Sequence, residues 1–238
     1  MIMYKRPLVA LMVGLLAATS FGADREVEKL LARMREVYSG TKTARMVIKT
    51  TGPRFGKSVI VTELTYMKER KIFARLSGFE SLKGRTRTFI SDGQRVSVDD
   101  FNGNFRYRDF DLDFIPMPVN LEAMSFWDWK RQLSTSVGSN MHESTFRLRK
   151  EVPWNNKNWI VLEEKAEQQK VSVDYFIDPK TALIYRVLVY DYNKKTLTTE
   201  TVLTKLERNI KVDGSLFKVK KAPAPSSVRT TVEKRIKF

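Results

Sequence analysis

Apolar residues near the start of the chain recur at helical spacing, and the pattern then changes. Asp24 can cap a helix whose apolar positions lie three or four residues apart, and Gly40 can end it. The apolar residues of this stretch are Val27, Leu30, Leu31, Met34 and Tyr38. We therefore expect one short amphipathic helix at this point of the chain.

From Ala44 onward the period is two, and short alternating runs are separated by turn dipeptides such as Asp92-Gly93 and Asp213-Gly214. Strands are expected near Ala44–Thr50, Ser58–Tyr66, Lys71–Ser77, Arg85–Ser91, Arg95–Asp99, Phe105–Asp109, Thr145–Lys150, Trp159–Lys165, Val171–Ile177, Leu183–Asp191, Thr196–Glu207 and Phe217–Val219. So many successive strands predict a mainly β, antiparallel meander. It must curl into a barrel or a strongly bent half-barrel to protect its edges.

A second helix is expected between the two series of strands. Asn120 can cap it, and it runs through Leu133. Its apolar residues are Leu121, Met124, Phe126, Trp127, Trp129 and Leu133. They cover more than one stripe, which predicts a helix buried over a wide face.

The first residues have the order of a secretory signal peptide. Lys5 and Arg6 precede an apolar run from Leu8 to Ala18, and the small residues Ser20, Gly22 and Ala23 follow it. The run is shorter than the roughly 20 residues that a bilayer span needs, although a retained N-terminal anchor is the alternative. We expect a signal peptide at residues 1–22 and export to the periplasm.

The remaining residues are enough for one large β domain, which we place at residues 23–225. An Ala-Pro-Ala-Pro-Ser-Ser stretch begins at Ala222 and has the composition of an extended linker. The basic tail at residues 226–238 is expected to lie outside the core.

The chain is strongly basic and has no cysteine. Its formal net charge is +16, and removal of the two basic residues before the cleavage region leaves +14. Such a field attracts anionic partners, and export favours lipid head groups or envelope polysaccharide over nucleic acid. The alternative is that the charge only keeps the chain soluble. Without cysteine the chain forms no disulfide and cannot carry the lipid-modified cysteine of a lipoprotein.

No constellation of residues indicates an enzyme. His142 is the only histidine, and its neighbours do not resemble a nucleophile elbow or a zinc helix. Asp109, Asp111 and Asp113 resemble half of a calcium loop, but the glycine and the distal glutamate that close such a loop are missing. We expect no catalytic site, no metal site and no cofactor.

Pairs of basic residues two positions apart lie within several predicted strands, so each pair projects from one face of the sheet. The candidates for an anionic head-group face are Arg85, Arg87, Arg106, Arg108, Arg147 and Arg149, and Lys218 with Lys220 forms a similar pair. A basic outer face is one interpretation. A solvated strand face without a specific partner is the other.

The apolar residues of the sheet and of the second helix can line a ligand cavity or pack as a solid core. The candidates for an acyl cavity and its lid are Met46, Ile48, Leu64, Tyr66, Phe73, Phe89, Phe110, Phe114, Met124, Phe126, Trp127 and Trp129. The pattern of these residues does not choose between a cavity and a core.

Four short segments resemble the outer-membrane lipoprotein carrier family of the LolA/LolB type. Tyr66–Phe73 resembles its strand-turn-strand segment, and Ile90–Val96 resembles its Ser-Asp-Gly hairpin. Ile177–Ile184 and Leu216–Val219 resemble segments of its C-terminal half. The resemblance extends over roughly Arg25 to Pro225.

The resemblance implies an incomplete antiparallel β-barrel, closed by short helices, whose apolar cavity receives acyl chains in the periplasm. The implied partners are lipids or acylated lipoproteins, with an anionic membrane surface and envelope transport proteins in addition. No nucleic acid partner is implied, and we expect a monomer. The family's Lys-Arg-Pro turn, whose arginine holds the lid, is Lys68-Glu69-Arg70 in this chain, so that role does not transfer, although Arg70 can substitute.

Two functions from different classes follow from these observations. The first is an exported carrier that shelters acyl chains in a hydrophobic cavity. The second is an envelope sensor that binds lipid and passes the signal to a protein partner. Related sheets serve both purposes, so the fold alone does not choose between them.

The apolar run from Leu8 to Ala18 predicts processing of the N-terminus. Intact-mass measurement of protein from the envelope fraction should give a chain that begins near Ala23. A mass that includes Met1 would contradict the signal peptide.

Overall fold

The structure, a computed structural model, describes residues 25–80, 84–99, 105–109, 144–166 and 170–219. They form one helix at residues 25–40, two short 3-10 helices and one eleven-stranded sheet. The bounds are β1 (Thr43–Thr51), η1 (Pro53–Phe55), β2 (Ile60–Met67), β3 (Lys71–Ser77), β4 (Arg87–Asp92), β5 (Arg95–Asp99), β6 (Phe105–Asp109), β7 (Ser144–Trp154), β8 (Lys157–Ala166), β9 (Val171–Ile177), β10 (Ile184–Asp191), β11 (Leu197–Arg208) and η5 (Gly214–Phe217).

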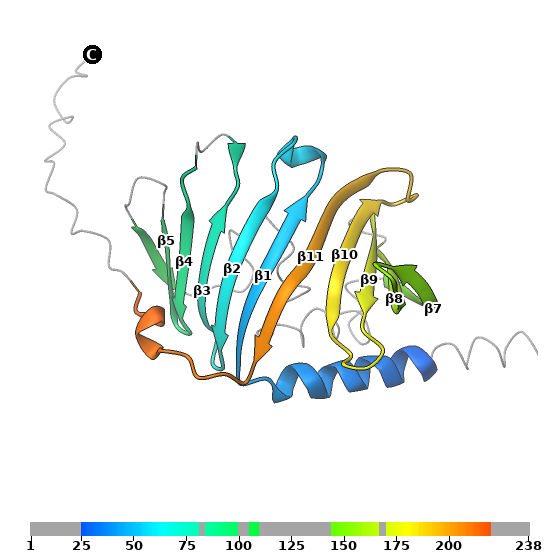
Figure 1. The fold of residues 1–238 in the computed structure, drawn as a ribbon, viewed down its shortest axis with the longest axis horizontal. Coiled ribbons are helices and arrows are strands. Elements are labelled where there is room, and N and C mark those ends of the chain that lie inside the picture. Colours follow the sequence, from blue (N-terminus) through cyan, green and yellow to red (C-terminus); the bar gives the residue numbers. More distant parts are fainter. Residues whose placement is uncertain (1–24, 81–83, 100–104, 110–143, 167–169, 220–238) are drawn as a thin grey trace, which may run out of the picture.

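The sheet is open and curved (Figure 1). Its strand order is β6-β5-β4-β3-β2-β1-β11-β10-β9-β8-β7, and each neighbouring pair is antiparallel. Two meanders, β1 to β6 and β7 to β11, are joined by the pairing of β1 with β11. Strands β6 and β7 form the two edges, so the bent half-barrel is confirmed and the closed barrel is wrong.

All predicted strands but the last are present. The strand predicted at Phe217–Val219 is wrong, because Gly214–Phe217 form η5. Asp213 caps this turn through its side chain, which accepts a hydrogen bond from Ser215 N at 2.9 Å. Lys218 follows the turn and is not part of a strand, and Lys220 lies outside the described residues.

The core lies on one face of the sheet, which we call the inner face. In β1, Ala44, Met46 and Ile48 are buried on this face, whereas Arg45 and Lys49 are exposed on the outer face. Tyr66 is opposite Ala44 in the ladder, and residues directly opposite each other share a face, so the alternation continues from strand to strand.

The predicted first helix is confirmed and packs against the inner face. All five of its predicted apolar residues are buried there, in the same cluster as Met46 and Leu64. Tyr38 Oη accepts a hydrogen bond from the buried Ile184 N–H at 3.1 Å. Burial raises the pKa of Tyr38 well above its usual value. Figure 1 shows the helix along the lower ends of β9, β10 and β11.

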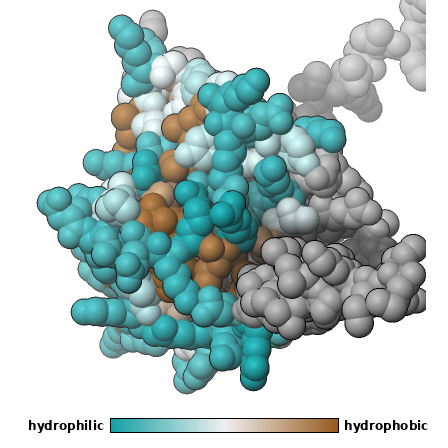
Figure 2. Space-filling model, turned by 90° about the vertical axis from the view of Figure 1, so that its right-hand side faces the viewer, coloured by the Kyte–Doolittle hydropathy of each residue, from teal (hydrophilic) through white to brown (hydrophobic). Residues whose placement is uncertain are grey.

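The outer face has a smaller apolar cluster over β8, β9 and β10. Trp159, Val161, Phe176 and Leu188 are buried in it, and Trp154 packs against them with its ring centroid 5.0 Å from that of Trp159. Viewed from the side of β7, the molecule shows apolar surface between hydrophilic side chains (Figure 2). This cluster stabilises the C-terminal meander from the side away from the main core.

A network of ion pairs lies beside the outer cluster, where Lys194 Nζ is 5.8 Å from the ring centroid of Tyr190. Lys194 Nζ lies 2.7 Å from carboxylate oxygens of both Glu163 and Asp174, and Arg149 also binds Asp174, at 2.8 Å. Burial works to raise the pKa of Glu163, but the hydrogen bond and charge of Lys194 and the nearby arginines lower it overall. The network therefore favours the ionised form of Glu163.

A tight turn between β9 and β10 anchors the helix. Asp178 accepts hydrogen bonds from Lys157 Nζ at 2.7 Å and from Lys180 N at 2.8 Å. Arg33 of the helix donates to the carbonyl oxygens of Pro179 and Lys180 in the same turn. Asp178 thus fixes the loop on which one side of the helix rests.

We predict that Asp178→Asn weakens the fold in a pH-dependent way. Burial raises the pKa of Asp178, but the Lys157 and backbone hydrogen bonds outweigh this and lower it. A lowered folded-state pKa contributes stability above the unfolded value of about 3.9, and that contribution is lost as the pH falls through the folded value. The variant should lose about 1.5–3 kcal/mol of unfolding free energy at pH 7, and the difference should narrow below about pH 4.

Urea unfolding at several pH values measures this effect. Glu28→Gln, which removes one negative charge from the exposed side of the helix, is the control and should stay within about 0.5 kcal/mol of the parent. An Asp178→Asn deficit that is the same at pH 7 and pH 3 would contradict the assigned role of the carboxylate.

Candidate functional site

The connection between β1 and β2 forms one wall of a hollow at the upper end of the sheet. Pro53 begins η1, and Phe55 N donates to Gly52 O at 2.9 Å, so the chain turns sharply. A side chain at Gly52 would collide with the backbone of Thr198 at the start of β11. The glycine therefore lets this turn pack closely against β11, and Phe55 packs against the main core.

The segment after β3 forms the facing wall. Gly78 has a φ of +91°, and a side chain there would collide with the carbonyl oxygen of Val59. Glu80 N donates to Ser58 Oγ at 3.3 Å. The close approach at Gly78 places Phe79 beside the β1–β2 turn, where it packs against the same core as Phe55.

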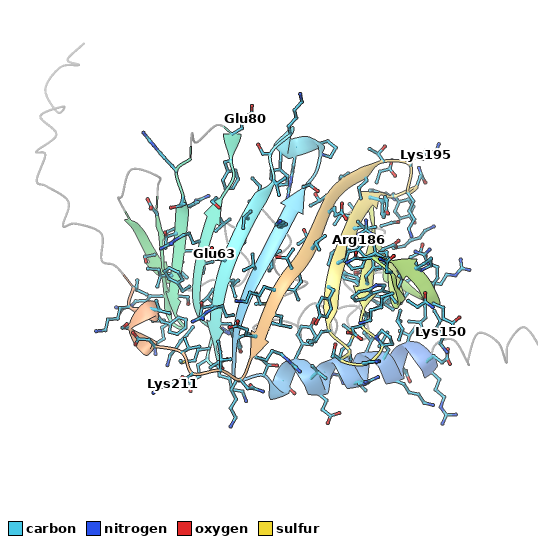
Figure 3. The ribbon with its side chains drawn as sticks, viewed as in Figure 1. Glu63, Glu80, Lys150, Arg186, Lys195 and Lys211 are labelled. Carbon is cyan, nitrogen blue, oxygen red and sulfur yellow. The ribbon has the colours of Figure 1, made fainter. Side chains whose placement is uncertain are left out.

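Together these walls border an open hollow of about 500 Å³, which we call the rim pocket. It is lined by Arg54, Phe55, Gly56, Ser58, Ile60, Phe79 and Glu80. Phe55, Ile60 and Phe79 form its apolar part, and the exposed Arg54 and Glu80 contribute its charged groups. Figure 3 shows Glu80 at the upper end of the sheet. The volume lies within the range of about 300–1,000 Å³ that small-ligand pockets occupy.

The rim pocket adjoins the inner face. Ile60 is opposite Thr50 in the β1–β2 ladder, and Thr62 follows two residues deeper on the same face, opposite Ile48. Thr62 is fully buried, and its Oγ1 has no hydrogen-bond partner in the part of the chain that the structure describes. An orphan hydroxyl next to an apolar pocket can donate to a ligand oxygen.

Five predicted cavity residues meet on the inner face and form one cluster. They are Met46, Ile48, Leu64, Tyr66 and Phe89, each between 1% and 5% exposed. Burial also raises the pKa of Tyr66. In this structure they pack as a core, and the rim pocket is the hollow beside them. Phe110, Phe114, Met124, Phe126, Trp127, Trp129 and the predicted Asn120–Leu133 helix lie outside the described residues.

The assignment of Phe73 to this cavity is corrected. Ile72 and Ala74 are the buried neighbours of Phe73 on the inner face, so Phe73 points to the outer face, where it is half-buried near Arg75. Three successive apolar residues concealed the alternation in the sequence. The register with β2 shows it, because Ile72 is opposite Tyr66 and Phe73 is opposite Thr65.

The predicted basic face is also corrected, because its residues do not share one surface. Arg87 is opposite Leu76 on the inner face, whereas Arg149 is opposite Val161 on the outer face, next to the exposed position of Arg147. Arg149 is already paired with Glu163 and Asp174. Exposed Arg85 precedes β4, and Arg106 and Arg108 lie in the edge strand β6.

The lining residues Phe55 and Phe79 were missed by the sequence interpretation. Both adjoin glycine in a turn, as Phe55-Gly56 and Gly78-Phe79. Large apolar residues in turns are the signal that could have found them, since a solvated loop does not require them. Arg70, the suggested substitute for the lid arginine, is exposed in the β2–β3 turn at the lower end of the sheet.

Candidate metal ligands do not gather in the described part of the chain, where no group of three or more histidine, cysteine, aspartate or glutamate residues could hold an ion. His142 lies outside the described residues. The described helix is not long and apolar enough to span a bilayer.

The fold is similar to several solved structures. MucB in complex with MucA(peri) aligns with a TM-score of 0.43 and 15% identity, over 83% of this chain and 60% of that one. LprF from Mycobacterium bovis aligns with a TM-score of 0.46 and 11% identity, over 79% and 95%. A LolA superfamily protein from Nitrosomonas europaea aligns with a TM-score of 0.38 and 9% identity, over 80% and 96%.

A putative outer membrane lipoprotein-sorting protein domain from Vibrio parahaemolyticus aligns with a TM-score of 0.42 and 9% identity, over 80% of this chain and 95% of that one. The chain spans about 60% of the length of the MucB chain in that complex. No protein-family model and no curated protein matches the chain.

We predict that Gly78→Ala destabilises the protein more than Gly84→Ala does. Both glycines have positive φ, but only a side chain at Gly78 meets backbone within 4 Å. The first change should lower the unfolding free energy by about 2 kcal/mol or more and the second by about 1 kcal/mol, as measured by urea unfolding. Equal losses of unfolding free energy in the two variants would show that the close contact between Gly78 and Val59 does not hold this wall of the pocket in place.

Proposed function

We propose that this chain is an exported carrier that binds the acyl chains of a lipid or of a lipid-modified protein, with the rim pocket as the entrance to its inner face. The rim pocket supports this proposal most directly. Its apolar part continues into the core through Phe55 and Phe79, and its charged groups lie at the solvent side. This is the polarity of an amphiphile, with an apolar chain and a polar head.

The inner face has the chemistry to accept an acyl chain beyond the pocket. It is apolar over most of its area, and Met34 and Met46 lie in its core. Methionine is flexible and polarisable, so it adapts to a chain inserted next to it. Thr62 supplies a hydroxyl that can donate to an ester or carboxyl oxygen. Because the core is packed in this structure, binding would spread it apart, starting from the half-buried phenylalanines at the rim.

The remaining parts of the proposal follow the sequence. The predicted signal peptide supports a periplasmic location, and the absence of cysteine favours a carrier without a lipid anchor. Acylated lipoproteins, other lipids and envelope transport proteins remain the proposed partners, and the protein is proposed to act as a monomer without catalysis. The second hypothesis, a lipid-binding sensor with a protein partner, uses the same pocket and differs in what is bound outside it.

We predict that Phe79→Ala weakens the binding of a fluorescent fatty acid about five- to tenfold. Loss of one partly buried aromatic contact corresponds to about 1–1.4 kcal/mol. Phe73→Ala is the matched control, because Phe73 is also half-buried but points to the outer face. It should leave the affinity within about twofold. Titration of the purified protein with the probe measures both.

Equal affinities for the parent and both variants would contradict the rim pocket as the entrance. Organic-solvent extraction of the protein, followed by mass spectrometry, is the second measurement. A copurified lipid or acylated peptide that is lost from Phe79→Ala, but kept by Phe73→Ala, is the expected result.

A further inference from the structure

The upper end of the sheet differs from the rest of the described surface in its exposed apolar residues. Val59 and Leu197 are the large apolar side chains that remain exposed in the described part of the chain, at 43% and 37%. Val59 precedes β2, and Leu197 begins β11, so both lie at the end where β1 leads into η1. The rim pocket opens at this same end.

Exposed cations accompany these residues. Arg54 and Lys57 lie in the β1–β2 turn, which has no acidic residue between Gly52 and Val59. Arg85 precedes β4, and Lys195 lies in the β10–β11 hairpin, where Figure 3 shows it at the upper end. We call this surface, formed by residues 52–59, 78–80, 84–86 and 191–197, the upper rim. The acidic residues of the upper rim are Glu80 and Asp191.

The lower end of the sheet also carries exposed lysines, but other elements lie across it. The helix runs along the lower ends of the C-terminal strands, and the segment after β11 crosses below the others to reach η5 (Figure 1). Lys68 and Lys211 are exposed at this end. A surface that met the lower end would therefore meet positive charge without reaching the rim pocket.

We propose that the upper rim is the surface by which the protein docks on an anionic lipid bilayer. Lys57 and Lys195 approach the head groups, and Val59 and Leu197 contact the boundary of the acyl chains. Cations near an anionic membrane and apolar side chains at its interface both contribute to such binding. The inference rests on the proposed function in one respect: docking in this orientation turns the rim pocket toward the lipid that would enter it.

The test compares two pairs of charge reversals with equal change in net charge. Lys57→Glu with Lys195→Glu alters the upper rim, and Lys68→Glu with Lys211→Glu alters the lower end. All four lysines are exposed, and none of them forms an ion pair with another residue of the described part of the chain. Binding is measured by cosedimentation with vesicles of phosphatidylglycerol and phosphatidylcholine in equal amounts, at low and at high salt.

The upper-rim variant should bind these vesicles about tenfold more weakly than the lower-end variant, with the difference shrinking at high salt. Val59→Ser with Leu197→Ser should reduce the binding that remains at high salt. Equal losses from both charge variants would show that only net charge matters and would overturn the proposal. Binding of the upper-rim variant at the parent level would also overturn it.

A fatty-acid titration in vesicle-free solution separates this inference from the proposed function. The upper-rim variant should bind the probe as the parent does, because Lys57 and Lys195 do not line the rim pocket. Normal docking with no probe binding by the parent would refute the carrier function and leave the docking surface standing. If the parent bound the probe normally but the upper-rim and lower-end variants bound vesicles equally, the docking surface would be refuted and the carrier function would stand.

Discussion

The pairing of β1 with β11 holds the whole molecule together. It joins the two meanders into one sheet and runs from Ala44 opposite Arg208 to Thr51 opposite Glu200. Beyond the ladder, Asn209 N donates to Thr43 O at 2.8 Å, which extends the contact at the lower end. Without this pairing, each meander would expose a long edge and only part of the apolar inner face would be continuous.

The pairing of β1 with β11 also determines where the rim pocket forms. The β1–β2 turn packs against the first residues of β11 through Gly52, and the segment after β3 packs against that turn through Gly78. The pocket walls are thus held by backbone contacts, while the phenylalanines that line them remain half-buried. A site with a firm frame and adaptable side chains suits ligands that vary in length more than in chemistry.

The local periods of the sequence predicted the elements well, because a helix stripe and strand alternation depend on neighbours along the chain. The face of the sheet on which a side chain lies depends on the strand register, and the pairing of strands sets that register. Phe73 was therefore placed with the wrong residues, and Arg87 and Arg149 were assigned to one surface although they lie on opposite faces. The rim pocket was not predicted, since it forms only when the strands β2 and β3 pair and bring the turns before and after them together. The calcium-loop alternative and the aromatic second helix concern residues whose side chains the structure does not describe.

The central ladder also governs the timing of folding. Thr50 and Thr201, whose hydroxyls lie 3.3 Å apart across it, are separated by 151 positions, so the ladder closes only after almost the whole domain has been synthesised. Sheets built from such distant partners fold slowly compared with helical domains. During that interval the first meander stays without its central neighbour and the inner face stays uncovered. The topology therefore leaves the apolar inner face incomplete until the last strand of the sheet, β11, is available to pair with β1.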